Sequence, residues 1–358
     1  MNQSEVQRIE DVLRKTVELN GSDLHLTPRL PPVVRIHGEL QKIDGYPALD
    51  ASDLHSMIYS ILEPHQVETL ESEFELDFSH SIDGISRYRG NVMRQRNSIA
   101  AVFRVVPWDV PTLDSLGLPD RVKDFCDLPR GLVVVTGPTG SGKSTTLAAM
   151  INRINTERKL NIITIEDPIE FLHEYKESII KQREVGSDTH SFATALRHAL
   201  RHDPDVLLIG EMRDQESIGI ALTAAETGHL VFSTLHTQTA PLTVNRILDM
   251  FPDAMKDQVR GQLAGALQGI VSQQLLQRSD DQGRVVAAEV FVSNPAARNL
   301  IREGNEHQLY SILETGRTDG MQTMDHALAS LNRKGLISRK TALAHCVDRK
   351  ALQRHMAF

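Results

Sequence analysis

One nine-residue segment constrains the fold of this chain more than any other. Residues 137–145 read GPTGSGKST, which fits the phosphate-loop pattern G-x-x-x-x-G-K-[ST] at every position. An apolar stretch, residues 132–136, precedes the segment, and residues 146–150 have the composition of a helix start. A strand, a glycine-rich turn and a helix in this order predict an α/β fold with a nucleotide at the turn.

The chemistry of a triphosphate explains these residue types. Glycines let backbone N–H groups curl around phosphate oxygens, and the following helix directs its positive N-terminus at the same charge. The pattern assigns Lys143 to the β- and γ-phosphates and the Ser144 hydroxyl to Mg²⁺. We therefore predict ATP and Mg²⁺ as ligands, bound by Gly137, Pro138, Thr139, Gly140, Ser141, Gly142, Lys143, Ser144 and Thr145.

Further apolar strands follow the phosphate loop. We expect them at residues 161–166, 206–209 and 230–233, with helices at 192–202 and 215–227 between them. Apolar strands that alternate with helices indicate a parallel sheet covered on both faces. After residue 240 the pattern is mostly helical, with one more strand at 285–292.

Two of these strands end in acids, and chemistry in a parallel sheet gathers at the carboxyl ends of strands. Glu166 and Glu211 are therefore candidates for activating water and positioning the metal. Glu211 is also a candidate Mg²⁺ ligand, directly or through a water molecule. Gly210 stands where a magnesium-linked Asp is usual. Taken alone, each acid is equally well explained as a loop cap.

Histidines flank the strand at 230–233. His236 follows it and is a candidate γ-phosphate sensor, with a structural hydrogen bond as an equal alternative; His229 is a candidate nucleotide contact. His198 and His202 have the spacing of metal ligands on a helix. No third ligand is evident in the sequence, so we interpret this pair as a solvated helix face.

The first part of the chain has a different pattern. An amphipathic helix is predicted at 5–19, then short β-rich segments and one helix at about 52–62. We predict an α+β domain over residues 1–106, a linker over 107–118 and an ATPase domain over 119–358. Basic residues gather near the end of the first domain: Arg87, Arg89, Arg94, Arg96 and Arg104. They form either a solvated basic face or a surface that docks an acidic partner. Alternatively, they are arginine fingers for the phosphates of a neighbouring subunit.

Composition limits the partners. Lys and Arg number 39 against 47 Asp and Glu, a net charge of −8, and aromatic residues are 4%. Both values disfavour a constitutive nucleic-acid binder. Two cysteines form neither a disulfide framework nor a four-cysteine zinc site. No apolar run reaches the roughly 18 residues of a membrane span, so we expect a cytoplasmic chain without membrane insertion.

The motifs together resemble the secretion ATPase superfamily of type IV pili and type II secretion, and most closely the pilus retraction ATPases of the PilT type. The resemblance rests on SDLHL (22–26), PPVVR (31–35), the phosphate loop, TIEDPIE (164–170), DPD (203–205), GEMRD (210–214) and TGHLVFSTLH (227–236). It implies a PAS-like N-terminal domain, a RecA-like ATPase domain, a homohexameric ring and nucleotide bound between domains. It also implies that Arg89 and Arg104 are paired catalytic arginines, that Glu166 is the general base and that His236 senses phosphate.

The direction of the motor follows from further likenesses. AARNLIRE (296–303) is close to the retraction family's AIRNLIRE, with Ala297 in place of Ile, and GMQTMD (320–325) is retraction-like. Extension motors usually carry a long N-terminal extension and a four-cysteine zinc motif. We expect an ATPase that retracts type IV pili by acting on an inner-membrane platform protein, optionally with a paralogous retraction ATPase. An accessory retraction paralogue (PilU type), an extension or type II secretion ATPase, a nucleic-acid translocase and a nucleotide-gated scaffold are the alternatives.

Overall fold

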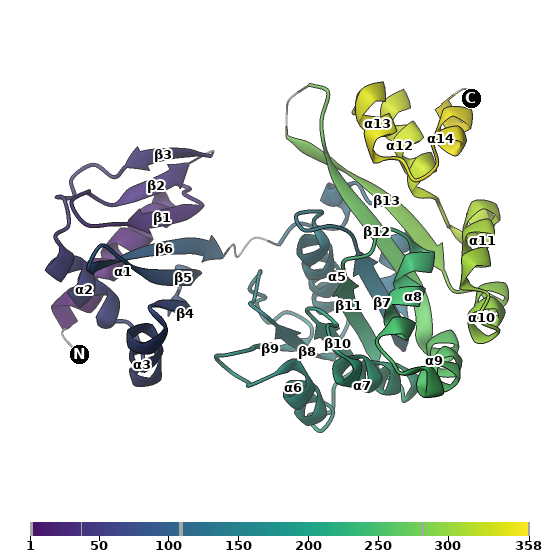
Figure 1. Ribbon diagram of the computed structural model, residues 1–358, viewed down its shortest axis with the longest axis horizontal. Helices are drawn as coiled ribbons and strands as arrows, with labels where there is room; N and C mark the ends of the chain where they lie inside the picture. Colours follow the sequence, from purple (N-terminus) through teal and green to yellow (C-terminus); the bar gives the residue numbers. More distant parts are fainter. Residues whose placement is uncertain (1–2, 37, 107–109, 281–282, 357–358) are drawn as a thin grey trace. The chain divides into compact units, whose positions relative to one another are not determined.

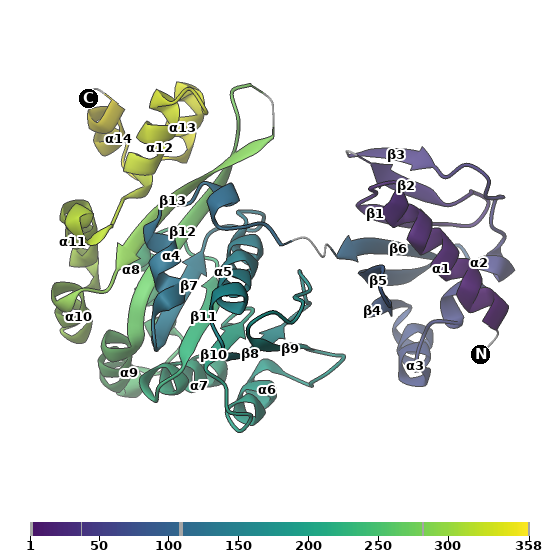
Figure 2. The same ribbon diagram turned by 180° about the vertical axis from the view of Figure 1, so that it is seen from behind.

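The computed structural model describes residues 3–36, 38–106, 110–280 and 283–356. Contacts between residues divide the chain into two compact units, Met1–Asp109 and Val110–Phe358, called here the N-terminal and C-terminal units. Figures 1 and 2 show the elements of both from opposite sides. The predicted linker starts with residues 107–109, which lie outside the described residues; the remainder of that segment belongs to the C-terminal unit.

The N-terminal unit contains a six-stranded antiparallel sheet in the order β3-β2-β1-β6-β5-β4. Its strands are β1 Asp23–Leu26, β2 Val33–Ile36, β3 Glu39–Lys42, β4 Glu75–Ile82, β5 Ser86–Gln95 and β6 Ser98–Val106. Side chains alternate along β5, where Tyr88 is fully buried between the more exposed Arg87 and Arg89. This alternation gives the sheet one apolar face and one face that carries arginines.

The helices of this unit supply the rest of its core. They are α1 Gln3–Glu18, α2 Ala51–Tyr59 and α3 Pro64–Glu73. Ile9 and Leu13 of α1 are fully buried, and the hydroxyl of Tyr88 donates to the carbonyl of Leu13 (3.2 Å). The predictions of α1 and α2 are confirmed, but α3 was missed. It buries Leu70 alone, so it has no apolar stripe to reveal it.

The C-terminal unit contains a seven-stranded sheet in the order β13-β12-β7-β11-β10-β8-β9. The six strands from β12 to β9 are parallel, and β13 pairs antiparallel with β12. The strands are β7 Gly131–Thr136, β8 Asn161–Glu166, β9 Ile179–Glu184, β10 Val206–Ile209, β11 Leu230–Leu235, β12 Leu267–Gln277 and β13 Arg284–Val292. The parallel sheet and a strand at 285–292 were predicted; the antiparallel direction of that strand, β13, is a finding of the structure.

Helices pack against this sheet and extend beyond it. They are α4 Arg121–Asp124, α5 Lys143–Glu157, α6 Phe192–Ala199, α7 Gln215–Glu226, α8 Ala240–Asp249, α9 Asp253–Ala266, α10 Pro295–Arg302, α11 Leu309–Thr315, α12 Met324–Arg333, α13 Arg339–His345 and α14 Arg349–Met356. The last three lie together as a C-terminal module (Figure 1). The module shares an apolar cluster with Leu276 and Ala287 of the β12–β13 pair. In the described part of the chain, we find no helix with both the length and the apolar character of a membrane span.

Candidate nucleotide site

The phosphate loop connects β7 to α5. Gly137 follows the strand with φ at +142°, and a Cβ there would lie 2.3 Å from the backbone oxygen of Gln273. The loop therefore runs against β12, and only glycine fits its first position. Gly140 and Gly142 also have positive φ values, of 78° and 89°, but have open space around them. The glycines of the pattern thus serve two needs, close packing and backbone curvature.

Lys143 is the first residue of α5 and is buried. Its Nζ donates to the carbonyl oxygens of Gly137 (3.0 Å) and Pro138 (3.2 Å), so the side chain folds back over the loop. Desolvation lowers the pKa of Lys143, and the negative charge of Glu211 opposes this shift. Anionic ligand oxygens would offset the same desolvation cost. Ser144, the next residue, is exposed at the start of the helix.

Parallel pairing brings several predicted residues to one edge of the sheet. Leu235 of β11 pairs with Thr136 of β7, and β10 and β8 follow in order. The carboxyl ends of these strands therefore lead into the phosphate loop, His236, Glu211 and Glu166 along a single line. This arrangement places both candidate carboxylates and one candidate histidine at the edge where the phosphate loop lies.

Glu166, the last residue of β8, is held by two neighbours. Its Oε1 accepts hydrogen bonds from Thr164 Oγ1 (2.7 Å) and Gln182 Nε2 (3.2 Å). Burial raises the pKa of Glu166, and these two hydrogen bonds partly counteract the rise. A carboxylate with a raised pKa is a stronger base when ionised, as a general base requires.

Glu211 has the opposite electrostatic environment. One oxygen lies 2.9 Å from Arg213 Nη2 and the other 3.3 Å from His236 Nε2. Desolvation acts to raise the pKa of Glu211, but the hydrogen bonds and positive charge of Arg213 and His236 outweigh it, and the pKa is lowered. A Cβ at Gly210 would lie 3.3 Å from the Glu166 Cα, a tight contact that β8 could accept only with a small shift.

The two histidines of the TGHLVFSTLH segment are far apart. His236 is 47% exposed beside Glu211. His229 precedes β11, and its carbonyl accepts the N–H of Gly131 at the amino end of β7. The length of a six-residue strand, about 20 Å, separates that edge from the phosphate loop. The expected place of His229 in the nucleotide site is thus not supported; its ring instead bonds the Ala224 carbonyl (2.9 Å).

The candidate arginines lie in the N-terminal unit. Arg89 of β5 and Arg104 of β6 are directly opposite each other in the strand register, so their side chains emerge on the same face. Arg104 is 64% exposed, and its Nε donates to Asp23 Oδ1 (2.9 Å). Of the other three, Arg94 pairs with Glu71 and stacks on Phe74, Arg96 lies in the β5–β6 turn, and Arg87 is paired across the sheet with Val106. The register singles out Arg89 and Arg104 as a pair.

His198 and His202 are exposed, and they line a groove of about 570 Å³ with Lys181, Arg183 and His190. Across the described ranges, no three His, Cys, Asp or Glu side chains gather closely enough to hold a metal ion. Asp188 also lines the groove, which lies beside β9 and α6.

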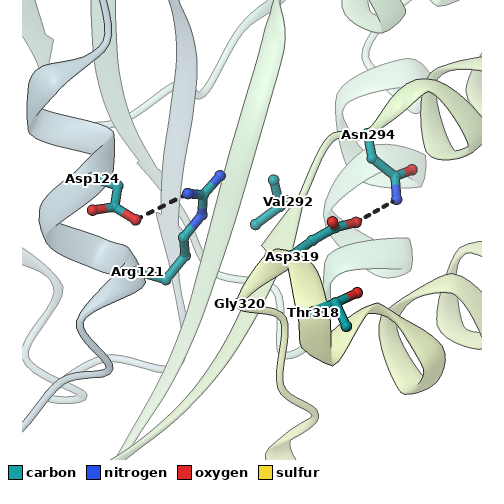
Figure 3. A pocket seen from close by; sticks show the side chains of 7 residues that line it. All are labelled: Arg121, Asp124, Val292, Asn294, Thr318, Asp319 and Gly320. Atoms are coloured by element: carbon teal, nitrogen blue, oxygen red, sulfur yellow. Dashed lines mark hydrogen bonds and ion pairs between the residues drawn. The ribbon is translucent and has the colours of Figure 1, made fainter.

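A second pocket lies in the C-terminal unit (Figure 3). Its volume is about 600 Å³, and it is lined by Arg121, Asp124, Val292, Asn294, Thr318, Asp319 and Gly320. Arg121 pairs with Asp124 (2.9 Å), and Asn294 Nδ2 donates to Asp319 Oδ2 (3.0 Å). None of the predicted nucleotide residues lines it, so this pocket is separate from the phosphate loop.

Sequence reasoning missed residues that hold the site in place. Gln182 reaches Glu166 from β9, a strand that was not predicted, and Gln273 Nε2 donates to Thr146 Oγ1 (2.9 Å) from β12, which was also missed. Arg213, which contacts Glu211, has no role that its place in the GEMRD segment would predict. Of these residues, only Thr164 could have been predicted to lie beside Glu166, because residues two apart on a strand share a face.

Comparisons with known proteins find relatives over most of the chain. A family model described as "Type II/IV secretion system protein" matches residues 104–343. The type IV pilus retraction ATPase PilT of Pseudomonas aeruginosa is 48% identical over 334 residues, 93% of this chain and 96% of that protein. A twitching motility protein of Neisseria gonorrhoeae is 50% identical over 311 residues, 87% of this chain and 83% of its own. The solved structure of the pilus retraction motor PilT with bound ADP has a TM-score of 0.89 and 48% identity, covering 96% of this chain and 98% of that one.

Proposed function

The chain belongs to the type II/IV secretion system protein family, among the pilus retraction ATPases, and we propose that it converts ATP hydrolysis into retraction of a type IV pilus. The observation that carries this proposal is one sheet edge where a complete phosphate loop lies in line with Glu166, Glu211 and His236. The similarity to pilus retraction ATPases supports retraction as the direction of the motor. The residues at this sheet edge support ATP hydrolysis as its reaction.

We propose that the phosphate loop binds ATP with Mg²⁺. The donor set fits the ion: the exposed hydroxyl of Ser144 and the carboxylate of Glu211, whose lowered pKa keeps it ionised, are the hard oxygen ligands that Mg²⁺ prefers. Glu211 acts either directly or through a water molecule. When bound, the ion neutralises charge on the phosphate oxygens.

Two carboxylates in different environments suit two roles. Glu166, with its raised pKa, is the proposed general base for the attacking water. Glu211, His236 and Arg213 form a polar cluster in which His236 is the proposed γ-phosphate sensor. Arg89 and Arg104 are proposed to stabilise charge on the phosphates of a neighbouring subunit. Arginines in that role accelerate hydrolysis about 10³–10⁵-fold.

The proposed working form is a homohexameric ring on the cytoplasmic side of the inner membrane, acting on the platform protein of the pilus machine. A paralogous retraction ATPase is an optional partner. Contacts of Lys143, His236 and the two arginines with the γ-phosphate disappear on hydrolysis, and this difference between nucleotide states drives the cycle. No nucleic-acid partner is proposed, given the net charge of −8.

Surface pili counted by electron microscopy test this function in cells that lack the chain. Excess pili without surface motility, corrected by wild type but not by Lys143→Ala, is the expected result. Bald cells would reverse the direction of the motor while leaving the ATPase intact. Purified protein gives the complementary test: Glu211→Ala should abolish turnover and retain most ATP binding.

A further inference from the structure

Glu289 is a buried acid for which the proposed hydrolysis has no use. It lies in β13 with no exposed surface. Its Oε1 accepts the N–H of Ala240 (2.8 Å), while Oε2 has no hydrogen-bond partner in the part of the chain that the structure describes. Burial raises the pKa of Glu289 to about 7, and the backbone amides of Ala240 and Met324 oppose that rise. A half-satisfied buried carboxyl is costly, so its position needs an explanation.

A row of buried polar side chains connects Glu289 to the phosphate loop. Thr136, immediately before the loop, pairs in register with Ser272 of β12, which in turn pairs with Glu289. All three are completely buried, and Thr136 Oγ1 donates to Ser272 Oγ (2.9 Å). Two strand pairings thus link the end of β7 to β13.

A second connection comes from the sensor loop, His236–Thr239. Thr239 caps α8, and Thr237 Oγ1 lies 2.7 Å from Thr243 Oγ1 on that helix. The loop is thus bound to α8, whose first residue is Ala240, the donor to Glu289. Glu289 therefore contacts the first residue of α8, the helix that follows the sensor loop.

The other side of Glu289 faces the C-terminal module. The backbone amide of Met324, the first residue of α12, is close enough to the Glu289 carboxyl to lower its pKa, although Oε2 has no hydrogen-bond partner in the described part of the chain. The segment leading there is fixed to β13, because the Gln322 N–H donates to the Val290 carbonyl (3.0 Å) and the Gln322 carbonyl accepts the Val290 N–H (2.9 Å). The Asn294–Asp319 hydrogen bond anchors the same segment further upstream (Figure 3).

Hydrogen bonds and apolar packing join the start of α12 to the rest of the C-terminal module. The buried carboxylate of Asp325 accepts the backbone N–H groups of Val347 and Asp348, each at 2.9 Å. These two residues lead into α14, which packs against α12 around Leu328 and Leu352. Asp325 thus ties the start of α12 to the start of α14.

We propose that Glu289 is a positioning residue that couples the sensor loop and the phosphate loop to the C-terminal module, so that the bound nucleotide sets the state of α12–α14. The inference rests on the proposed nucleotide site. It assigns the module to the output of the motor, where a partner of the ring can detect the nucleotide state. The element shared by both sites is the Ala240–Glu289 hydrogen bond.

Amide hydrogen exchange of the full chain, without nucleotide, with ADP and with a non-hydrolysable ATP analogue, tests the coupling. In wild type, nucleotide should change protection at the phosphate loop and, by about fivefold or more, in α12–α14. Glu289→Met keeps the size but removes the acceptor, so the first change should persist and the second disappear. Glu289→Gln retains an acceptor oxygen and should keep both.

The matched control is Glu306→Gln, which alters another buried acid, bonded to Arg260 (2.9 Å) outside this route, and should keep both responses. If Glu289→Met does not fold, the smaller Glu289→Ala also removes the acceptor and should show the same loss. Retention of the α12–α14 response in the acceptor-free variant, or no such response in wild type that binds nucleotide, overturns the coupling. Wild type that binds no nucleotide instead overturns the proposed function.

Discussion

At the scale of single residues, the hydrogen bond from Thr164 to Glu166 adjusts the proposed general base. This bond lowers a pKa that burial raises. Thr164→Val keeps the shape and removes the donor, so the pKa of Glu166 should rise further and ionised base should be lost at low pH. We expect kcat/KM for ATP to fall about tenfold at pH 6 and little at pH 8.5. Thr156→Val, at an exposed position on α5, is the control; a profile that falls equally at all pH values would contradict the role of Glu166.

The ionisation of Glu289 should make the stability of the folded chain depend on pH. Its pKa rises from the ordinary 4.5 to about 7 on folding, so between these pH values the folded chain holds a proton that the unfolded chain has released. The free energy of unfolding should therefore decrease as pH rises through this window, by about 3 kcal/mol in all. Glu289→Gln cannot ionise and should lack this contribution. Denaturant unfolding of both proteins at pH 5, 6, 7 and 8 measures the difference; parallel profiles would contradict the shift.

At the scale of elements, the contact between the phosphate loop and β12 separates two glycines that the pattern treats alike. Gly137→Ala places a Cβ 2.3 Å from the Gln273 backbone oxygen, so either the loop or β12 must shift. Gly140→Ala meets no atom within 4 Å and incurs only the strain of its positive φ, about 1–2 kcal/mol. Gly137→Ala should thus lose nucleotide binding and lower Tm more than Gly140→Ala. Calorimetry and titration with ADP compare the two; equal losses would exclude a special role for the β12 contact.

The composition of each strand explains which strands the sequence could predict. β7, β8, β10 and β11 are continuous apolar runs because both faces of their sheet are buried, and that pattern was recognised. β12 is equally central but carries Ser272 and Gln273, whose polar atoms bond Thr136 and Thr146. These polar residues fit inside the sheet because their hydrogen-bond partners, more than 100 positions earlier in the chain, lie beside them. The local sequence pattern does not reveal such partners. The order of strands that unites Glu166, Glu211 and His236 depends on the same long-range pairing.

At the scale of the whole molecule, the two groups of proposed catalytic residues lie in different units. Lys143, Glu166 and Glu211 belong to the C-terminal unit, and Arg89 and Arg104 belong to the N-terminal unit. The strand register explains why those two of the five arginines form a pair, which their spacing in the sequence did not reveal. Their assignment came from resemblance to a family, because a surface strand with alternating arginines has many uses.

This separation makes the proposed action on a neighbouring subunit testable by mixing two inactive variants. Lys143→Ala removes the phosphate contact and keeps the arginines, whereas Arg104→Ala keeps the phosphate loop and should lower kcat about 10³-fold or more. If arginines act across subunits, rings assembled from both variants contain sites where an intact loop meets an intact arginine, and ATPase activity should reappear. The control is Arg104→Ala mixed with Arg104→Ala/Lys143→Ala, which contains no such site. Activity that stays at the level of the parents in mixed rings would mean that each chain supplies Arg104 to its own nucleotide.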